Sequence, residues 1–246
     1  MSTQSDATTA AQRSPAPRPE PGPAPRPVPW TRVDTVLLDL DGTLLDLAFD
    51  SRFWRESVPA AWGRARSIEP EQARELLAPR FRAREGTLEW YCIDYWSREL
   101  QLDIAALKRA EAHRIRWLPG AREFLGRVRA LGKRLVLLTN AHPTTLAIKD
   151  ARTQVISYFD AAFSSHRFGA PKEQARFWER LARAEAFNVQ RSLFVDDSLP
   201  VLRAASAAGI STVYAVHRPD SSVQPRVQQE FAAVDAVGEL LQPGWG

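Results

Sequence analysis

Short apolar runs alternate with amphipathic stretches along most of this chain. The apolar runs predict β-strands at 33–38, 134–139, 161–164, 192–197 and 211–216. The amphipathic stretches predict helices at 50–64, 70–84, 88–100, 103–116, 121–131, 143–151, 173–184 and 200–208. Because strands and helices alternate, the predicted fold class is α/β, with an open parallel sheet covered by helices on both faces.

One long interruption divides this alternation. Residues 47–118 contain four helical patterns and no convincing strand. Pro70 suits a first helical turn and Asp103 suits an N-cap within this block. We therefore expect a core domain made of 30–46 and 119–246, with the helical block 47–118 inserted after the first strand as a cap domain.

The first residues have a different composition. Residues 1–29 are rich in Ser, Thr and Ala and then in Pro, and such a segment cannot bury a core. We expect an extended, mobile tail there. A solvated tail is favoured over a segment that docks on a partner.

Polar side chains stand where three of the predicted strands end. Since the carboxyl ends of parallel strands lie along one edge of the sheet, adjacent strands would bring these side chains into one cleft. The groups are Asp39 with Asp41, Thr139 with Asn140, and Asp196 with Asp197.

The pair Asp39 and Asp41 sets the candidate chemistry. Two like charges this close raise each other's pKa unless a cation lies between them. Four converging carboxylates favour a divalent cation with oxygen ligands, and Mg²⁺ is the predicted one. Lys172 adds a positive charge at a predicted helix start, which together with the hydroxyl and amide donors suits a phosphate group. Read alone, Asp39 and Asp41 are also compatible with a polar turn, and Lys172 with a solvated lysine.

Composition narrows the function classes. The chain has 246 residues, 44% of them hydrophobic, and a net charge of +4 without a basic stripe, which argues against binding a nucleic-acid polymer. Cys92 is the only cysteine, so an intrachain disulfide is impossible, and a buried structural thiol is the favoured interpretation. Because no apolar run reaches membrane-span length and no secretory signal is evident, we expect a cytoplasmic protein without membrane contact. No obligate protein partner is evident.

Four motifs in order carry a resemblance to the haloacid dehalogenase superfamily. They are DLDGT at 39–43, the strand ending in Thr139-Asn140, Pro171-Lys172, and FVDDS at 194–198. The resemblance covers about 33–216 and implies a Rossmann-like three-layer core with a helical cap of the C1 type. It implies that Asp39 is a nucleophile that forms an aspartyl-phosphate and that Asp41 is the general acid and base.

The same resemblance assigns the remaining site residues. Thr139 and Lys172 are similar to the family's phosphate-holding pair, with Asn140 donating from its amide or its backbone. Asp39 and the backbone carbonyl of Asp41 resemble Mg²⁺ ligands, and Asp197 resembles a third. This chain has Asp196 where many relatives have Gly, so Asp196 is interpreted as an outer or alternate metal ligand.

Longer stretches of the sequence restrict the set of candidate substrates. VDTVLLDLDGTLLDLAFDSRFW, LEWYCIDYWSREL, LLTNAHPTTLAIK and FGAPKE resemble the purine 5′-nucleotidases of this superfamily that act on GMP and IMP. Asp41 favours phosphate chemistry over dehalogenation, because relatives that displace halide lack this second aspartate. The predicted function is therefore a Mg²⁺-dependent phosphatase of purine nucleoside 5′-monophosphates, a small-molecule phosphomonoester class.

Two alternatives stay open at this point. A phosphatase or phosphomutase acting on a sugar phosphate or another small phosphomonoester would use the same core, whereas a non-enzymatic binding protein would be expected to lack Asp39 or Asp41. The cap aromatics are compatible with base stacking or with the cap's own core. These rings belong to Phe53, Trp54, Trp62, Trp90, Tyr91, Tyr95 and Trp96.

Overall fold

The computed structural model describes residues 27–241 of the chain. The predicted tail, residues 1–29, therefore lies outside the described residues except for its last three. Val28 is fully buried and packs in the core, and the indole of Trp30 donates to the carbonyl of Leu240 at 3.1 Å. The folded part thus already includes Val28, which the sequence placed in the tail.

A six-stranded parallel sheet forms the centre of the core, with the strand order β3-β2-β1-β4-β5-β6. The strands β1, β2 and β4 lie side by side, so the three strand ends that carry the polar pairs are neighbours. The strands are β1 Thr35–Leu38, β2 Arg134–Thr139, β3 Ala161–Ser164, β4 Ser192–Asp196, β5 Thr212–Val216 and β6 Ala232–Val234.

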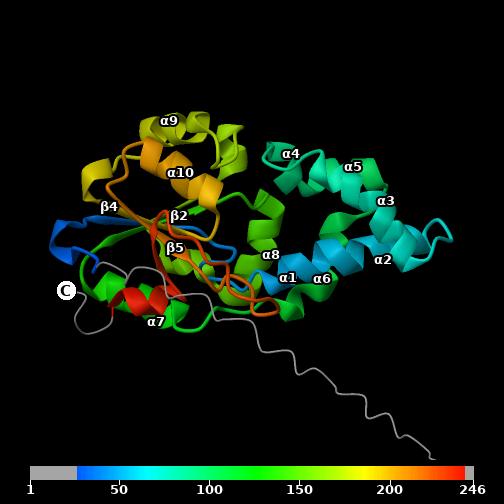
Figure 1. Ribbon diagram of the computed structural model, residues 1–246, viewed down its shortest axis with the longest axis horizontal. Coiled ribbons are helices and arrows are strands. Elements are labelled where there is room, and N and C mark those ends of the chain that lie inside the picture. The colour runs from blue at the N-terminus through cyan, green and yellow to red at the C-terminus, as the bar shows by residue number, and fades with distance from the viewer. Residues whose placement is uncertain (1–26, 242–246) are drawn as a thin grey trace, which may run out of the picture.

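Alternate residues of each central strand pack into different layers. In β1, Val36 and Leu38 contact the cluster that includes helices α7 and α8, whereas Leu37 contacts the cluster that includes α9 and α10. All four residues of β1 are buried, as expected for a parallel strand covered on both faces. The core is therefore a three-layer α/β/α sandwich (Figure 1). Its helices are α7 Ala121–Ala130, α8 Pro143–Thr153, α9 Ala175–Ala184 and α10 Leu199–Ala207.

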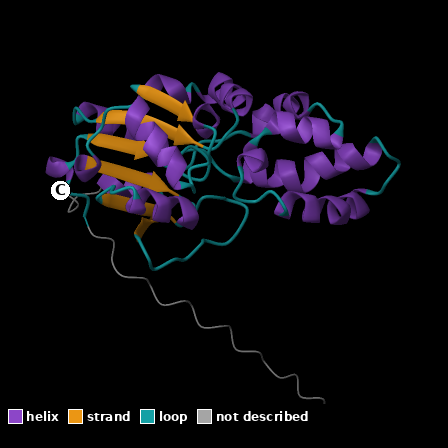
Figure 2. Ribbon diagram, turned by 90° about the horizontal axis from the view of Figure 1, so that it is seen from above, coloured by secondary structure: helices purple, strands orange, loops and turns teal. Residues whose placement is uncertain are grey.

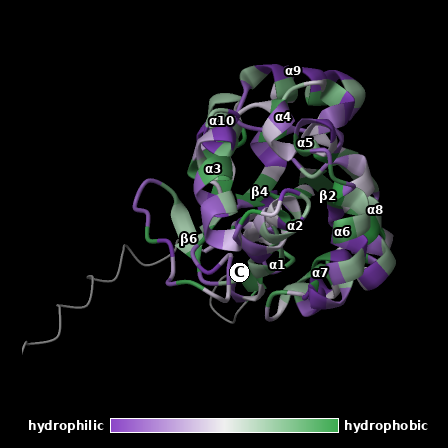
Figure 3. Ribbon diagram, turned by 90° about the vertical axis from the view of Figure 1, so that its right-hand side faces the viewer, coloured by the Kyte–Doolittle hydropathy of each residue, from purple (hydrophilic) through white to green (hydrophobic). Residues whose placement is uncertain are grey.

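The inserted block forms a helical cap with its own core. The strand arrows point toward this helical group, which lies beyond the carboxyl ends of the strands (Figure 2). A separate hydrophobic cluster, which includes Phe53, Trp62 and Trp96, holds the cap helices together. These helices mix hydrophobic and hydrophilic residues along their length, as amphipathic helices do (Figure 3). They are α1 Ala48–Arg52, α2 Val58–Arg64, α3 Pro70–Arg82, α4 Leu88–Tyr91, α5 Ile93–Leu100 and α6 Ile104–Glu111, with a π-helical turn at Phe53–Ser57.

The α/β fold with a helical cap confirms the predicted class, and the differences are local. The helix predicted at 88–100 is broken at Cys92, whose backbone is extended and whose sulfur accepts from the Tyr95 backbone N–H to start α5. The helix predicted at 103–116 ends at Glu111. Strand β6 was not predicted, because it is a short strand of which only Val234 is buried. The exact domain boundaries remain a prediction.

Across residues 27–241, no helix combines the length and the apolar character needed to cross a membrane.

Candidate active site

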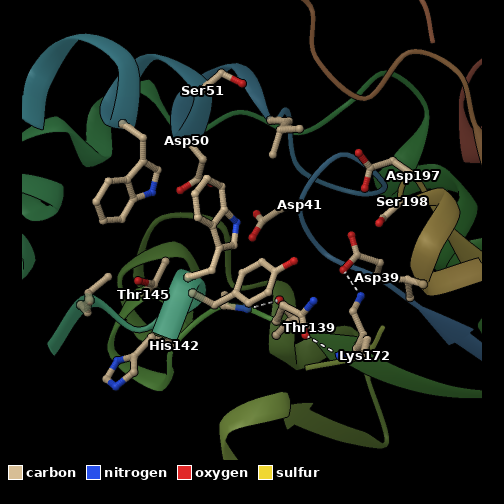
Figure 4. Close-up of a pocket in the computed structure, with 18 of the residues that line it drawn as sticks. Asp39, Asp41, Asp50, Ser51, Thr139, His142, Thr145, Lys172, Asp197 and Ser198 are labelled. Carbon is tan, nitrogen blue, oxygen red and sulfur yellow. Dashed lines mark hydrogen bonds and ion pairs between the residues drawn. The ribbon is translucent and has the colours of Figure 1, made fainter. Parts of the chain in front are cut away.

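A cleft of about 460 Å³ opens between the carboxyl edge of the sheet and the cap. This volume lies within the range of small-molecule sites. All seven site residues predicted from sequence line the cleft, and Figure 4 shows several of them pointing into it. They are Asp39, Asp41, Thr139, Asn140, Lys172, Asp196 and Asp197.

Lys172 joins the ends of strands β1 and β4. Its ammonium donates to Asp39, to Asp196 at 2.7 Å and to the Leu138 carbonyl at 3.0 Å. Lys172 is only 2% exposed, so these contacts replace its hydration. Although burial disfavours the ammonium, the two carboxylates hold the pKa of Lys172 above its ordinary value. Lys172 is therefore a permanent positive charge beside Asp39.

Asp39 has one carboxylate oxygen in use and one free. Its Oδ1 accepts from Lys172, whereas Oδ2 is buried and has no hydrogen-bond partner among the described residues. The pKa of Asp39 is raised to about 6, because burial and the charge of Asp196 together outweigh the opposing effect of Lys172. A buried, unpaired carboxylate oxygen is costly unless a ligand or cation uses it.

Asp39 belongs to a cluster of three carboxylates. One carboxylate oxygen each of Asp39, Asp196 and Asp197 lies within 4.8 Å of the others. Burial raises the pKa of Asp197 well above its ordinary value, and the charges of Asp196 and Asp39 add to this. Gly42 has a φ of 91°, and a Cβ there would lie 2.7 Å from Cγ of Asp197, so only glycine lets the Asp39 loop approach so closely. The donor set, all hard oxygens with one left unpaired, fits a divalent cation such as Mg²⁺.

Asp41 belongs to a different network, which reaches into the cap. Its carboxylate lies 2.6 Å from the ammonium of Lys149, and the same ammonium donates to Asp50 at 2.5 Å. Asp50 also accepts from Lys108 of α6. The pKa of Asp41 is raised to about 6, because burial and the charges of Asp50 and Asp39 together outweigh the opposing effect of Lys149. The Asp41 carboxyl is thus poised to exchange a proton near neutral pH.

Asp50 behaves in the opposite way. Burial favours its neutral form, but the ammonium groups of Lys108 and Lys149 outweigh this and hold the pKa of Asp50 below its ordinary value. Lys108 is 1% exposed and lies 4.5 Å from the centre of the Phe53 ring. Asp50 is therefore an anion that fixes two buried lysines, one from the cap and one from the core.

The end of strand β2 supplies two side chains with different duties. The hydroxyl oxygen of Thr139 accepts from the Ala141 N–H at 3.0 Å, which leaves its hydrogen to donate. The amide of Asn140 is engaged on both sides, because its oxygen accepts from the Lys172 N–H at 2.9 Å and its nitrogen donates to Glu173 at 2.9 Å. Glu173 also accepts from the hydroxyl of Tyr91 in the cap. Asn140 therefore braces the loop that carries Lys172.

The seven aromatic residues of the cap differ in whether they line the cleft. Phe53 and Trp62, which are buried within the cap, and the half-buried Tyr95 do not line the cleft, whereas the half-buried Trp54, Trp90 and Tyr91 do. Trp96 is buried but reaches the cleft, and its indole N–H donates to the Trp90 carbonyl at 3.0 Å. Two charged cap residues, Arg55 and Glu85, also line the cleft. Within residues 27–241 neither of them forms an ion pair.

Sequence reasoning missed Lys108, Lys149 and Asp50. A signal for the lysines was available, because the chain has only four lysines among 33 basic residues. Three of those four, Lys108, Lys149 and Lys172, are buried at the cleft. In a chain that otherwise uses Arg, these three lysines therefore mark places that need a compact ammonium.

Comparison with known proteins places these features in a family. Residues 33–209 match the haloacid dehalogenase-like hydrolases. The chain is 41% identical over 214 residues to the GMP/IMP nucleotidase YrfG of Escherichia coli, which covers 87% of this chain and 96% of the relative. It is also 31% identical over 192 residues to a phosphoglycolate phosphatase of Nitrosospira multiformis, covering 72% of this chain and 80% of that protein.

Solved structures with the same fold have more distant sequences. A phosphatase of the haloacid dehalogenase type from Thermococcus onnurineus superposes with a TM-score of 0.71 at 20% identity, covering 85% of this chain and 96% of that chain. The L-2-haloacid dehalogenase of Xanthobacter autotrophicus superposes with a TM-score of 0.58 at 18% identity and covers the same shares. These likenesses support the three-layer core with its cap.

Proposed function

The chain belongs to the haloacid dehalogenase-like hydrolases, and from this premise we propose that it hydrolyses purine nucleoside 5′-monophosphates, GMP and IMP, to nucleoside and phosphate. The observation that carries the proposal is the 41% identity to a GMP/IMP nucleotidase across 87% of the chain, cap included. The cleft supports it, because carboxylates and a lysine stand at one end and aromatic rings at the other.

The proposed reaction has two steps at phosphorus. In the first, Asp39 forms an Oδ–P bond while the bond from phosphorus to the 5′ oxygen breaks, and Asp41 gives its proton to the departing oxygen. In the second, Asp41 takes a proton from water, which attacks the aspartyl-phosphate and releases phosphate. The raised pKa of Asp41, about 6, suits a group that must first donate and then accept a proton.

Phosphate binding is assigned to Thr139 and Lys172. The Thr139 hydroxyl has a free hydrogen, and the Lys172 ammonium already lies against Asp39. The Asn140 amide also braces the loop that carries Lys172, because its oxygen accepts from the Lys172 N–H and its nitrogen donates to Glu173. The amide nitrogen has two hydrogens, so this bracing is compatible with the donor role toward phosphate that the sequence suggested.

A Mg²⁺ ion would be held by Asp39, by the backbone carbonyl of Asp41 and by Asp197. When bound, it would neutralise phosphate charge and help align the phosphoryl group. Asp196 is assigned outside the ligand set, because its two oxygens accept from Lys172 at 2.7 Å and from the Ser198 N–H at 2.8 Å. Asp197 is assigned to the ligand set because one of its oxygens lies within 4.8 Å of an oxygen of Asp39, although it also accepts from Arg226 at 2.8 Å.

We assign recognition of the purine base to the cap side of the cleft. Trp54, Trp90 and Tyr91 offer half-exposed ring faces for stacking, which typically contributes about 1–3 kcal/mol. GMP and IMP share an oxygen at C6 and a hydrogen on N1, and AMP has the reverse pattern. Arg55 can donate to the C6 oxygen and Glu85 can accept from N1–H, so we propose that these two residues select 6-oxopurines.

A second candidate is a phosphatase of another small phosphomonoester. It is favoured by the 31% identity to a phosphoglycolate phosphatase, since the core residues serve either substrate. We also propose the cytoplasmic location that was expected from the sequence.

A phosphate-release screen tests the function directly. With Mg²⁺ present, we expect IMP and GMP to give the highest kcat/KM in a panel that also holds AMP, ribose 5-phosphate and phosphoglycolate. The change Asp39→Asn should abolish release, whereas Asp34→Asn at the opposite end of the strand should not, because Asp34 is exposed and pairs with Arg191. Faster turnover of phosphoglycolate or ribose 5-phosphate than of IMP and GMP would replace the substrate assignment, and full activity of Asp39→Asn would refute the nucleophile.

A further inference from the structure

Cys92, His142 and His166 converge beside the cleft, where the cap meets the core. The sulfur of Cys92 and one ring nitrogen of each histidine lie within 4.8 Å of one another. Cys92 stands at the break between α4 and α5 of the cap, His142 precedes α8, and His166 follows β3. Three separate segments thus bring two imidazoles and a thiol to one point, and the proposed reaction uses none of them.

His166 has a ring nitrogen with an unused lone pair. The hydroxyl hydrogen of Ser164 is used on the Ala141 carbonyl at 2.7 Å, so its 3.4 Å contact with Nδ1 of His166 places the ring hydrogen on Nδ1. Nε2 of His166 is then an acceptor, and it is buried with no hydrogen-bond partner among the described residues. Burial, with some help from His142, also lowers the pKa of His166 to about 4, so the ring is neutral at pH 7.

The second histidine has the opposite tautomer. The backbone N–H of Thr144 donates to Nδ1 of His142 at 3.3 Å, so the ring hydrogen of His142 lies on Nε2. The carboxylate of Asp94, in the cap, lies 3.5 Å from this Nε2. A metal ion would take Nδ1 in place of the long Thr144 contact, and Asp94 would then be the outer partner that commonly orients a metal-bound histidine.

This donor set differs in kind from the carboxylate cluster. A thiolate with two imidazoles is typical of Zn²⁺ and its neighbours in the first transition series, whereas Mg²⁺ requires oxygen ligands. Ligand atoms around a tetrahedral Zn²⁺ lie roughly 3.3–3.8 Å apart, given the usual bond lengths. The three side chains need to approach one another by at most about 1–1.5 Å to reach that geometry.

We propose that Cys92, His142 and His166 form a site for a thiophilic divalent metal, which when filled ties the cap to the core. Cys92 is carried by the cap and the two histidines by the core, so the metal bonds would span the boundary between them and would restrict any movement of the cap that admits substrate. A filled site is expected to slow turnover while the carboxylate cluster stays intact. The proposal holds whichever phosphomonoester is the substrate.

Cobalt provides a probe that reports on sulfur directly. The full-length protein, free of Mg²⁺, is titrated with Co²⁺ while the near-ultraviolet thiolate-to-cobalt charge-transfer band is followed. We expect one equivalent of Co²⁺ to produce the band and Zn²⁺ to remove it by competition. Cys92→Ser should lose the band, and both Cys92→Ser and His166→Ala should bind Zn²⁺ at least roughly 10–100-fold more weakly, the loss that even outer-shell changes commonly produce.

Two control variants separate this site from others. His113→Ala removes an exposed histidine of the cap, and Asp39→Asn disables the carboxylate cluster, so both should keep the band. Absence of the band in the unmodified protein, its persistence in Cys92→Ser, or its loss in Asp39→Asn would overturn the site. At saturating Mg²⁺, added Zn²⁺ should lower kcat of the unmodified protein more than that of Cys92→Ser. Equal inhibition of the two proteins would overturn the cap-tying role, because Zn²⁺ would then act at the carboxylates.

Discussion

Lys149 of the core donates to Asp50 of the cap at 2.5 Å, and the same ammonium lies 2.6 Å from Asp41. Asp41, the group assigned to proton transfer, is therefore connected to α1, the first helix of the cap, through the buried ammonium of Lys149. Asp50 in turn accepts from Lys108 on α6. Cap position and the protonation of Asp41 are thus linked through shared charges, in which Lys149 is a positioning residue.

Replacing Lys149 by Met should expose this link. Two carboxylates lose their buried cation, so we expect stability to fall by about 3–5 kcal/mol and kcat to fall roughly 10–100-fold. Because Lys149 lowers the pKa of Asp41, its loss keeps Asp41 protonated to higher pH. The descending limb of the plot of kcat/KM against pH should therefore shift to higher pH.

The matched control is Lys133→Met. Lys133 is the one lysine of the chain that does not line the cleft, and it lies at the opposite end of the sheet, next to the start of β2. Its replacement should leave the pH profile in place. An unshifted limb in Lys149→Met, together with preserved folding by circular dichroism, would show that Lys149 does not act through Asp41.

The change Asp41→Asn should have an effect that depends on the leaving group. General acid catalysis typically contributes 10²–10⁴-fold, so we expect a loss of about that size with IMP. p-Nitrophenyl phosphate has a leaving group that needs no proton, so its phosphoryl transfer to Asp39 should be far less affected. Because Asn cannot activate water, phosphoenzyme should accumulate, which rapid-quench measurements can detect. Equal losses for both substrates in the first step would argue against the acid role.

Asp197 should reveal a conflict between stability and metal binding. Its pKa is raised in the folded protein, so the folded state holds its proton longer than the unfolded state does. Stability therefore falls as pH rises from about 4 through the folded-state pKa. Asp197→Asn removes this repulsion, and without Mg²⁺ the variant should melt higher than the unmodified protein at pH 7, by about 2–4 °C for each kcal/mol recovered.

Metal addition completes that test. Mg²⁺ should raise the melting temperature of the unmodified protein and do much less for Asp197→Asn, because a ligand is missing. Melting curves at pH 5, 6 and 7, with and without Mg²⁺, measure both effects. An equal Mg²⁺ response in the two proteins would remove Asp197 from the ligand set.

Part of the site was predictable from the sequence and part was not. The residues at the ends of β1, β2 and β4 were predictable together, because the carboxyl ends of parallel strands share one edge. The Asp41–Lys149–Asp50 contact was not, because it depends on how α1 and α8 pack against the sheet, and a helical pattern does not specify that rotation. The break at Cys92 was missed for a similar reason, since LEWYCIDYW has helical spacing on both sides of one extended residue.

Arg55 and Glu85 are the residues proposed to select the purine base. If Arg55 donates to the C6 oxygen and Glu85 accepts from N1–H, then Arg55→Met and Glu85→Gln should each lower kcat/KM for IMP and GMP about 10–100-fold, the size of a hydrogen bond to a charged group. Ribose 5-phosphate has no base, so its kcat/KM should stay unchanged in both variants. This measurement is the control for damage to the carboxylates that carry out the reaction. AMP, which lacks N1–H, should gain relative to IMP in Glu85→Gln, because Gln can donate to its N1 as well as accept. An unchanged ratio of IMP to AMP in both variants would move base selection away from Arg55 and Glu85 to the aromatic wall.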